Sequence, residues 1–387
     1  MNRYEKYDLL IIGGGISGSV FASDYIKKKP IHKIALIEAG RNLGGRSSTR
    51  ISRRFKEFEI NHGAPNFNIS NSNRNDLLKN FIQELLDDKF IRSDNSELIE
   101  EVNSDDFDKG MNSEFLYGKN YISSSSMSNL SHQIIEKNNL RDQIDFYFET
   151  LILNLEFHNN YWILTSIDGD IFKSKYLVFA SNLLLHKRSF EILNVNQIPL
   201  RQAVPRNKNK KIDSLLKTLE NQYFLPRLSF LIYTNSNYEF KDAYFKKYRY
   251  LFLNNDLENK YKFERIIFQN HRGNKLSIVI HSRSIDLIND YNKSDKLYIF
   301  KQNIFRNFNE LFNQNKFINK LSGSENISIM KWRGSQPYGE AVPSSLQFCS
   351  QYNIGFCGDW FDEIGFGRIE GAILSALKLG NVFKNLN

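Results

Sequence analysis

The chain has 387 residues, 41% of them hydrophobic and 25% charged, and its 52 Lys and Arg against 43 Asp and Glu give a formal net charge of +9. This composition excludes a mainly disordered chain, and the length exceeds that of a usual single core, so we expect two lobes or a domain with a large insertion. No apolar stretch approaches the roughly 20 residues that span a bilayer, and the apolar run 9–12 is too short for a secretory signal, so no membrane span and a cytoplasmic location are the default expectations.

Charge and cysteine content narrow the function classes further. The basic residues are dispersed, and their dense clusters at 27–29 and 206–211 are typical of solvated helix ends or loops, so nucleic acid and an anionic membrane surface are minority interpretations. A net positive field still favours anionic small molecules such as dinucleotides. Cys349 and Cys357 are too few for a disulfide framework and indicate a reducing compartment, with a bridge between them as an alternative. Their spacing predicts no zinc site.

The N-terminal segment predicts a βαβ unit. An apolar run at 8–12 leads through glycines into a helical stretch that ends near Lys29, and a second short strand, 33–38, ends on Glu38. Gly13, Gly15 and Gly18 match the GxGxxG fingerprint, in which the glycines allow a tight turn, the approach of a pyrophosphate to the backbone, and close packing of helix on strand. Glu38 follows Gly18 by twenty residues, where a carboxylate accepts hydrogen bonds from an adenosine ribose. The unit therefore predicts dinucleotide binding.

The middle of the chain alternates between helical and strand patterns. Residues 71–140 are mixed and helical, with apolar residues at helical spacing that indicates core packing. These are Leu77, Leu78, Phe81, Ile82, Leu85 and Leu86. From 144 to 180 the pattern predicts strands. The expected strands are 146–148, 151–157, 162–167 and 176–180, with a turn at Asp168 and Gly169.

The rest of the chain predicts a second lobe and a return to the first. Residues 186–325 combine aromatic-rich strands at 228–233 and 276–281 with a polar helix around 296–312, as suits a lobe that faces a ligand. A strand at 354–357 and a helix at 369–383 then follow.

The segment 43–50, Leu-Gly-Gly-Arg-Ser-Ser-Thr-Arg, distinguishes FAD from NAD. It resembles the GGRxxT/S-R motif that follows the Glu-ended strand in flavin amine oxidases, carotenoid desaturases and renalases. In that superfamily the glycines and the first arginine lie along the FAD pyrophosphate and the flavin edge. Glycines give access to the backbone, and a guanidinium offers forked donors to phosphate, so the resemblance is physically consistent. The alternative is a basic turn paired with surface acids.

Three further segments carry the resemblance. Residues 61–67, Asn-His-Gly-Ala-Pro-Asn-Phe, are similar to the D-x-G-A-Q-Y segment of renalase-like proteins, with Asn61 in place of the acid and Pro65-Asn66 in place of Gln-Tyr. Residues 127–130 occupy the place of the G-M/I-S-x-L turn that opens a helix. Residues 331–337, Lys-Trp-Arg-Gly-Ser-Gln-Pro, look like the K/H-x-W-R-x-S/A-x signature before the renalase C-terminal FAD motif.

The last segments resemble that second FAD motif. Residues 354–360 end a strand in Gly-Asp, and residues 367–372 open a helix whose start faces the isoalloxazine in the family. The resemblance implies that Asp359 accepts hydrogen bonds from the ribityl or pyrophosphate region. Backbone amides near Ile369 and Glu370 would stabilise negative charge on the reduced flavin. The alternative for Glu370 is a helix with an acidic first turn.

Together these segments predict an α/β protein with a Rossmann-like FAD-binding lobe and a discontinuous α+β substrate lobe, the architecture of the amine oxidase and p-hydroxybenzoate hydroxylase folds. We expect residues 1–70, 143–185 and 329–387 in the FAD-binding lobe and residues 71–142 and 186–328 in the substrate lobe. The expected cofactor-binding residues are Gly13, Gly15, Ile16, Ser17, Gly18, Glu38, Ala39, Gly44, Gly45, Arg46, Gly63, Ala64, Leu151, Gly358, Asp359, Ile369 and Glu370.

The resemblance implies an FAD-dependent oxidoreductase of the renalase-like branch. A small donor, a dihydronicotinamide isomer or an amine, would give a hydride to flavin N5, and dioxygen would reoxidise the flavin. At the reaction site, His62 is a candidate proton relay or a structural histidine, Trp332 a cavity wall or a core residue, and Arg333 a candidate anion or carbonyl ligand. No metal is expected. The alternatives are a desaturase or isomerase of an isoprenoid or pigment and an FAD-bearing escort protein without turnover.

Overall fold

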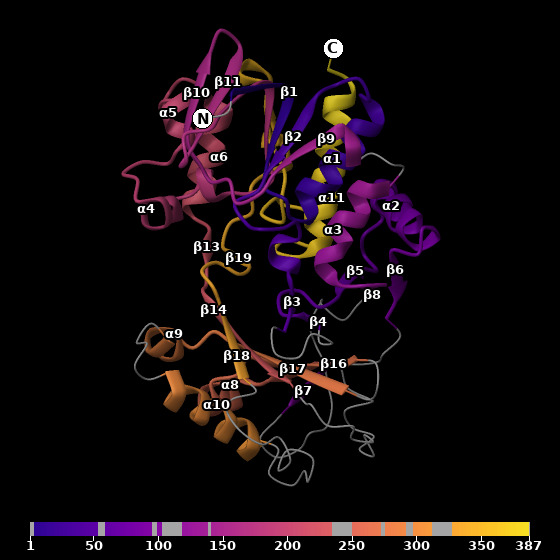
Figure 1. Ribbon diagram of the computed structural model, residues 1–387, viewed down its shortest axis with the longest axis vertical. Coiled ribbons are helices and arrows are strands. Elements are labelled where there is room, and N and C mark those ends of the chain that lie inside the picture. Colours follow the sequence, from indigo (N-terminus) through magenta and orange to yellow (C-terminus); the bar gives the residue numbers. More distant parts are fainter. Residues whose placement is uncertain are drawn as a thin grey trace.

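The computed structural model describes residues 4–52, 59–94, 99–102, 118–137, 141–233, 250–271, 275–291, 297–311 and 327–386. Two sheets, one above the other in Figure 1, organise this part of the chain. The upper sheet has eight strands, six of them in the order β10-β11-β12-β1-β2-β9, with β21 between β12 and β20. Their bounds are β1 (Tyr4–Ile12), β2 (Ile34–Ile37), β9 (Ile144–Tyr147), β10 (Ile152–His158), β11 (Tyr161–Ser166), β12 (Ile171–Phe179), β20 (Phe348–Cys349) and β21 (Ile354–Phe356).

The centre of the upper sheet is parallel and buried on both faces. Strand β1 pairs in parallel with β2 and with β12, and β12 pairs in parallel with β21. Residues 9–12 of β1 are all buried, which explains why this strand is a continuous apolar run. Leu9 and Ile11 face one hydrophobic core, and Leu10 and Ile12 face another.

Helices cover both faces of the upper sheet. One core contains residues of α1 (Ile16–Lys28), α2 (Asp76–Asp87), α3 (Met127–Glu136) and α11 (Ile369–Lys384). The opposite core contains residues of α5 (Leu200–Ala203) and α6 (Lys210–Glu220), and the short helix α4 (Arg188–Leu193) precedes them. Four of these helices pack on the upper sheet although they come from segments that we expected in the substrate lobe (Figure 1). They are α2, α3, α5 and α6.

The lower sheet has six strands in the order β18-β14-β17-β16-β15-β7. Their bounds are β7 (Ile99–Val102), β14 (Arg227–Tyr233), β15 (Tyr250–Leu253), β16 (Arg265–His271), β17 (Lys275–Ser282) and β18 (Ile327–Trp332). One face packs against α8 (Asn255–Tyr261), α9 (Ile285–Tyr291) and α10 (Leu297–Leu311). The other face contacts Ile60 of the first lobe, and Leu231, Tyr250 and Val279 are part of the same cluster.

Short strands join the two parts. Strands β13 (Tyr223–Phe224) and β19 (Pro337–Tyr338) pair where the chain enters and leaves the lower sheet (Figure 1). Two small sheets lie beside the first lobe. They are β3 (Thr49–Ile51) with β4 (Glu59–Asn61), and β5 (Phe67–Ser70) with β8 (Gly118–Ser123) and β6 (Ile91–Ser93).

The mixed α/β architecture confirms the predicted fold class, and the predicted strands and helices are found within a few residues of their expected bounds. Strand β12 begins earlier than expected, because residues 171–174 pair with both β1 and β11. The helical spacing in α2 buries Leu78, Phe81 and Leu85 as predicted, whereas Leu77 is exposed in the first turn.

Gln269 of β16 ties the two parts together through the backbone of Asn61. Its amide nitrogen donates to the Asn61 carbonyl at 2.7 Å, and its amide oxygen accepts from the Asn61 N–H at 3.0 Å. Both bonds are buried. A side-chain amide here does what a neighbouring strand does in a sheet, since it pairs with both polar groups of one residue.

We expect Gln269→Ala to lower the free energy of unfolding by about 2–6 kcal/mol, because it leaves two buried backbone groups unpaired at about 1–3 kcal/mol each. Urea unfolding measures the change. Gln83→Ala is the control, since Gln83 lies on the surface of α2 and bonds only an exposed partner, Asp87; its effect should stay within about 0.5 kcal/mol. Equal effects of the two variants would contradict the bridging role.

Candidate functional site

The glycine-rich turn lies between β1 and α1, as the fingerprint predicts. The Gly13 N–H donates to the Ile37 carbonyl at 2.9 Å, which ties the turn to β2. A Cβ on Gly18 would lie 2.0 Å from the Gly13 oxygen, so only glycine lets the helix pack this closely on the turn. Helix α1 begins at Ile16 with no side-chain cap and no acidic residue in its first turn. The positive end of the helix dipole is therefore left uncompensated by the helix itself.

Gly15 has an open face. A Cβ built on it meets, within 4 Å, only the Cα of Gly45, at 4.0 Å. Gly44 lies alongside and donates its N–H to the Gly14 carbonyl at 2.9 Å, so the two glycine segments form one surface. Gly44 and Gly45 have φ of 116° and 52°, values that favour glycine. Space next to the backbone of a helix start is what a phosphate group requires.

Glu38 ends β2 beside this surface. One carboxylate oxygen accepts from the Gly14 N–H at 2.7 Å and the other from the Gly40 N–H at 2.6 Å. These bonds fix the orientation of the carboxylate, and each oxygen keeps a lone pair for a further donor such as a ribose hydroxyl. Ala39, the next residue, is exposed. Leu151 is half-buried, and its carbonyl accepts from the Ile167 N–H at 2.8 Å.

Arg46 joins the first predicted cofactor motif to the last. Its guanidinium donates to both carboxylate oxygens of Asp359, at 2.7 and 2.5 Å, and to the Ser335 carbonyl at 2.8 Å. Arg46 and Asp359 are 313 residues apart in sequence. The Arg46 side chain is 44% exposed and that of Asp359 only 5%, so the carboxylate is buried beneath a partly exposed guanidinium. We call the place where this pair reaches the surface the recess. A forked arginine-carboxylate pair of this kind is among the stronger polar contacts in proteins.

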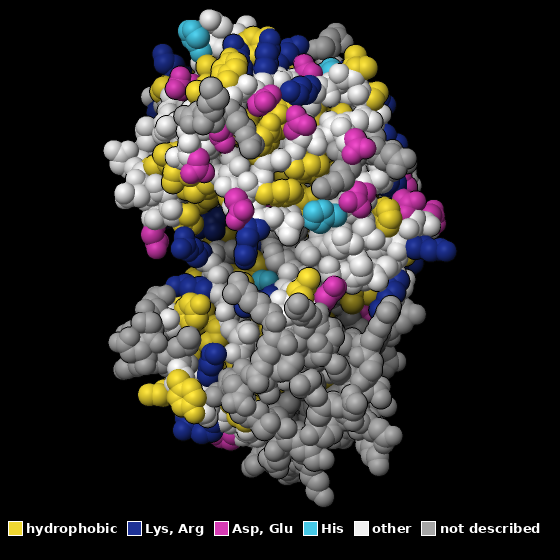
Figure 2. All heavy atoms as spheres, in the orientation of Figure 1, with side chains coloured by type: hydrophobic (Ala, Val, Ile, Leu, Met, Phe, Trp, Pro, Cys, Tyr) yellow, Lys and Arg dark blue, Asp and Glu magenta, His cyan; other side chains and the backbone are white. Residues whose placement is uncertain are grey.

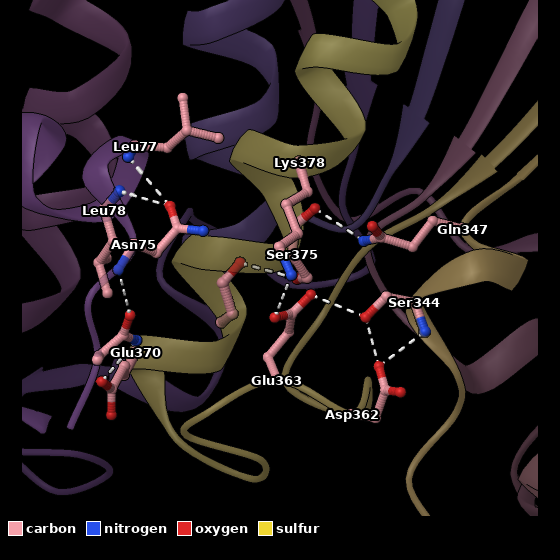
Figure 3. Close-up of polar contacts among 12 residues, drawn as sticks. Asn75, Leu77, Leu78, Ser344, Gln347, Asp362, Glu363, Glu370, Ser375 and Lys378 are labelled. Atoms are coloured by element: carbon pink, nitrogen blue, oxygen red, sulfur yellow. Dashed lines mark hydrogen bonds and ion pairs between the residues drawn. The ribbon is translucent and has the colours of Figure 1, made fainter.

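The loop that carries Asp359 is held in place by α11. Ser375 accepts a hydrogen bond from the Gly358 N–H at 2.9 Å and donates to the Gly358 carbonyl at 2.8 Å. Gly358 has φ of 155°, and a Cβ there would lie 2.0 Å from the Trp360 ring nitrogen. Further along, Lys378 pairs with Glu363 at 2.7 Å (Figure 3). The backbone around Asp359 is therefore set before any ligand binds.

The side chain of Glu370 points away from the recess. It is fully buried and accepts from the Ser70 N–H at 3.0 Å, the Ser70 hydroxyl at 2.9 Å, and the Asn73 amide at 2.9 Å. Arg368 pairs with it at 2.9 Å. Figure 3 shows Glu370 at the start of α11, facing the segment before α2. The Glu370 carboxylate is thus taken up by these partners, and a ligand at the helix start would meet backbone amides rather than this side chain.

His62 and Trp332 meet on the face of the lower sheet. Their rings stack with centroids 5.0 Å apart and planes inclined by 29°. The Trp332 ring N–H donates to the Ser229 hydroxyl at 3.0 Å, and Ser229 donates to the His62 carbonyl at 3.2 Å. His281 also donates to that carbonyl, at 3.1 Å. Arg333, the third expected residue, is exposed.

Burial and nearby arginines keep both histidines neutral. Burial, helped by the charge of Arg50, lowers the pKa of His62 to about 4 from its ordinary 6.5. Burial also lowers the pKa of His281 well below 6.5, with contributions from Arg265 and Arg227. The Nδ1 atoms of His62 and His281 are both buried without a hydrogen-bond partner in the described part of the chain. Each of these nitrogens can take a water molecule or a ligand group as its hydrogen-bond partner.

Asn61, Gly63 and Ala64 surround His62 on the loop after β4. The Asn61 side-chain oxygen accepts from the Met127 N–H at 3.0 Å and so caps α3, which begins at Met127 as predicted. A Cβ on Gly63 would lie 2.0 Å from the Arg46 carbonyl oxygen, and the Ala64 N–H donates to that carbonyl at 3.0 Å. The loop with His62 is thus packed directly against the Arg46 turn.

Three residues of this cluster were not expected from the sequence: Ser229, Gln269 and His281. Each lies on the strand face that points toward the His62 loop, as the two-residue alternation of β14, β16 and β17 requires. The alternation is readable in the sequence, but the loop that this face contacts is far away in the chain, so no local pattern marks these residues.

The remaining expectations concern cysteines, metals and membranes. Cys349 and Cys357 are buried and are not bonded to each other, and burial raises the pKa of the Cys357 thiol. Within the described ranges, no group of His, Cys, Asp and Glu side chains is arranged to hold a metal ion. Nor does any helix in those ranges have the length and apolar character to cross a membrane.

Comparison with known proteins agrees with this geometry. The family model described as an NAD(P)-binding Rossmann-like domain matches residues 11–85. No curated protein matches the sequence. Among solved structures, the chain is similar to putrescine oxidase bound to putrescine, with a TM-score of 0.65, 11% identity, and coverage of 98% of this chain and 99% of that one.

Two other similar structures are a putative protoporphyrinogen oxidase from Exiguobacterium sp. 255-15 (TM-score 0.65, 12% identity, 98% of each chain) and cyclohexylamine oxidase from Brevibacterium oxydans IH-35A (TM-score 0.63, 12% identity, 98% of each chain). At these identities the similarity establishes the fold alone. It confirms the predicted fold class, an α/β protein that contains a Rossmann-like domain.

The two glycines give a test of the dinucleotide site. Gly15→Ala should leave the free energy of unfolding within about 1 kcal/mol of wild type, because the added Cβ meets open space, yet it should weaken dinucleotide binding at least about tenfold by filling the space for a phosphate. Gly18→Ala should destabilise the fold by about 3 kcal/mol or more through a backbone clash. Thermal unfolding measures the stability of each variant, and a dinucleotide titration measures its affinity. If Gly15→Ala binds the dinucleotide as tightly as wild type does, the phosphate does not lie against Gly15.

The lowered pKa of His62 predicts acid sensitivity. The unfolded chain binds a proton at His62 below pH 6.5, whereas the folded chain binds one only below about 4, so stability falls as the pH drops through this window. Between pH 6.5 and 5 the contribution is roughly 2 kcal/mol. We expect His62→Gln to flatten this part of the stability curve, measured by urea unfolding, and His158→Gln, on an exposed residue, to leave it unchanged. An unchanged slope in His62→Gln would refute the neutral buried state.

Proposed function

We propose that this chain is an FAD-dependent oxidoreductase of the amine oxidase superfamily type. The observation that carries the proposal is the ion pair of Arg46 with Asp359, which brings the GGR segment and the second FAD motif into one recess. The fold it shares with putrescine oxidase and cyclohexylamine oxidase supports the same cofactor class. A match of a dinucleotide-binding family model to residues 11–85 agrees with it.

The residues present fit FAD. The open face of Gly15 and the uncapped start of α1 suit the diphosphate, and the anchored carboxylate of Glu38 suits the adenosine ribose. Arg46, half-exposed in the recess, has guanidinium donors for the phosphate or the flavin edge. The start of α11 offers backbone amides near Ile369, while the charge of Glu370 is taken up by Arg368, Ser70 and Asn73. When bound, FAD supplies a hydride acceptor at N5 and passes the electrons on, in this proposal to dioxygen.

In this proposal the reaction site lies beside the contact between the His62 loop and the lower sheet. Trp332 and His62 offer an aromatic surface, and Ser229 and His281 hold the His62 backbone against that sheet. Lys and Arg side chains gather around the hollow between the two parts of the molecule (Figure 2). This arrangement positions a small donor and contributes few groups that can move a proton.

The pKa of His62 favours one donor class of the renalase-like branch. With a pKa of about 4, His62 is a poor proton acceptor at neutral pH. A dihydronicotinamide isomer needs no base, because hydride loss leaves a stable aromatic cation, whereas an amine must first lose a proton. The dihydronicotinamide isomer is therefore the preferred donor in this proposal, with an amine as the second candidate.

The desaturase or isomerase alternative requires an apolar cavity. The strand face that meets the His62 loop carries Ser229, Gln269 and His281, whose polar groups hydrogen-bond to that loop, and this counts against a long apolar tunnel there. An FAD-bearing escort protein is compatible with the same residues, and only turnover distinguishes it from an enzyme.

We expect the purified protein to carry flavin absorbance or to acquire it when FAD is added, and Asp359→Asn to weaken that binding about tenfold or more through loss of a charged hydrogen-bond partner. Anaerobic mixing with dihydronicotinamide isomers should bleach the flavin, and amines should do so more slowly. Admission of air should restore the absorbance with release of hydrogen peroxide. If the protein takes up no FAD, the proposal is wrong. If it takes up FAD but no donor bleaches the flavin, the escort protein is favoured.

A further inference from the structure

Arg188, the first residue of α4, lies at the same recess although its segment carries no cofactor motif. Its guanidinium donates to the Asn182 side-chain oxygen at 2.8 Å and stacks on Phe224, with 3.8 Å between its Cζ and the ring centroid. Asn182 follows Ser181, whose Cβ would lie 3.0 Å from a Cβ on Gly13. The hydrogen bond to Asn182 and the contact of the adjacent Ser181 with Gly13 therefore connect Arg188 to the first glycine of the fingerprint.

The chain leaves room for this guanidinium. A Cβ on Gly334 would lie 1.9 Å from Arg188 Nη1, so the arginine occupies the space that any side chain at 334 would take. The start of α4 is fixed as well, since the Arg188 N–H donates to His186 Nδ1 at 3.1 Å and His186 donates to the Gln222 carbonyl at 3.0 Å. Arg188 is therefore held in one place by its surroundings.

The charges around Arg188 are unbalanced. Burial and the charge of Arg46 lower the pKa of Arg188 to about 10, and the charge of Asp359 opposes this change, so the three groups share one electrostatic environment. Two guanidiniums and one carboxylate leave one uncompensated positive charge. Arg188 Nε is also buried without a hydrogen-bond partner in the described ranges. An anion that entered the recess would supply the missing negative charge.

We propose that Arg188 is a second arginine that binds the diphosphate of FAD, acting together with Arg46. The inference rests on the proposed function, because it takes FAD as the cofactor. Arg46 is already engaged by Asp359, whereas Arg188 has a neutral partner in Asn182 and an aromatic ring in Phe224. A guanidinium with neutral neighbours keeps its charge for a ligand, and its planar fork matches phosphate oxygens.

The test compares the equilibrium binding of FAD with that of riboflavin, which has no phosphate. We expect Arg188→Gln to raise the Kd of FAD about 10- to 100-fold, the effect of losing a charged hydrogen bond, and to leave the Kd of riboflavin within about twofold of wild type. Arg188→Lys should recover part of the FAD affinity. Arg201→Gln is the control, since Arg201 lies on the neighbouring helix α5 and pairs with Asp213, away from the recess.

Gly334→Ala gives a second route that keeps the arginine. The added methyl group displaces the end of the Arg188 side chain, so FAD affinity should fall while riboflavin affinity is kept. Equal losses for FAD and riboflavin in Arg188→Gln, or an unchanged FAD affinity, would overturn the role of Arg188 while leaving the proposed function intact. A wild-type protein that binds neither flavin would overturn both proposals.

Discussion

The pairing of Arg46 with Asp359 is the contact on which the recess depends. It joins a turn that follows the second strand to a loop that follows the last strand, and it also takes in the Ser335 carbonyl on the segment that returns from the lower sheet. A buried carboxylate without its arginine would be costly, so neither partner can be changed alone without penalty. Three segments far apart in sequence are therefore held at one place, beside the glycines of the fingerprint.

A second set of contacts decides where the lower sheet meets this recess. Side chains of three strands, Ser229, Gln269 and His281, hydrogen-bond to the backbone of Asn61 and His62. The loop they hold is the one that packs against the Arg46 turn through Gly63. The same loop therefore contacts both the Arg46 turn and the lower sheet. The proposed hydride transfer requires fixed positions of this kind.

Local sequence predicted the parts of the molecule that local forces determine. The apolar runs and glycine spacing gave β1, α1 and β2, because burial on both faces and a tight turn leave direct traces in the sequence. The role of the Glu370 side chain was not predictable, since its partners Ser70 and Asn73 are 300 and 297 residues away. Arg188 was missed for a similar reason, because the packing of the neighbouring helices α5 and α6 on the first sheet is a property of the tertiary fold.

A structure of the protein crystallised with FAD tests the central claim most directly. We expect the diphosphate to lie against the open face of Gly15 and the start of α1, and the adenosine ribose to meet Glu38. Both Arg46 and Arg188 should contact the cofactor. A cofactor bound away from these groups, or a recess in which Arg46 and Asp359 are covered by protein alone, would contradict it.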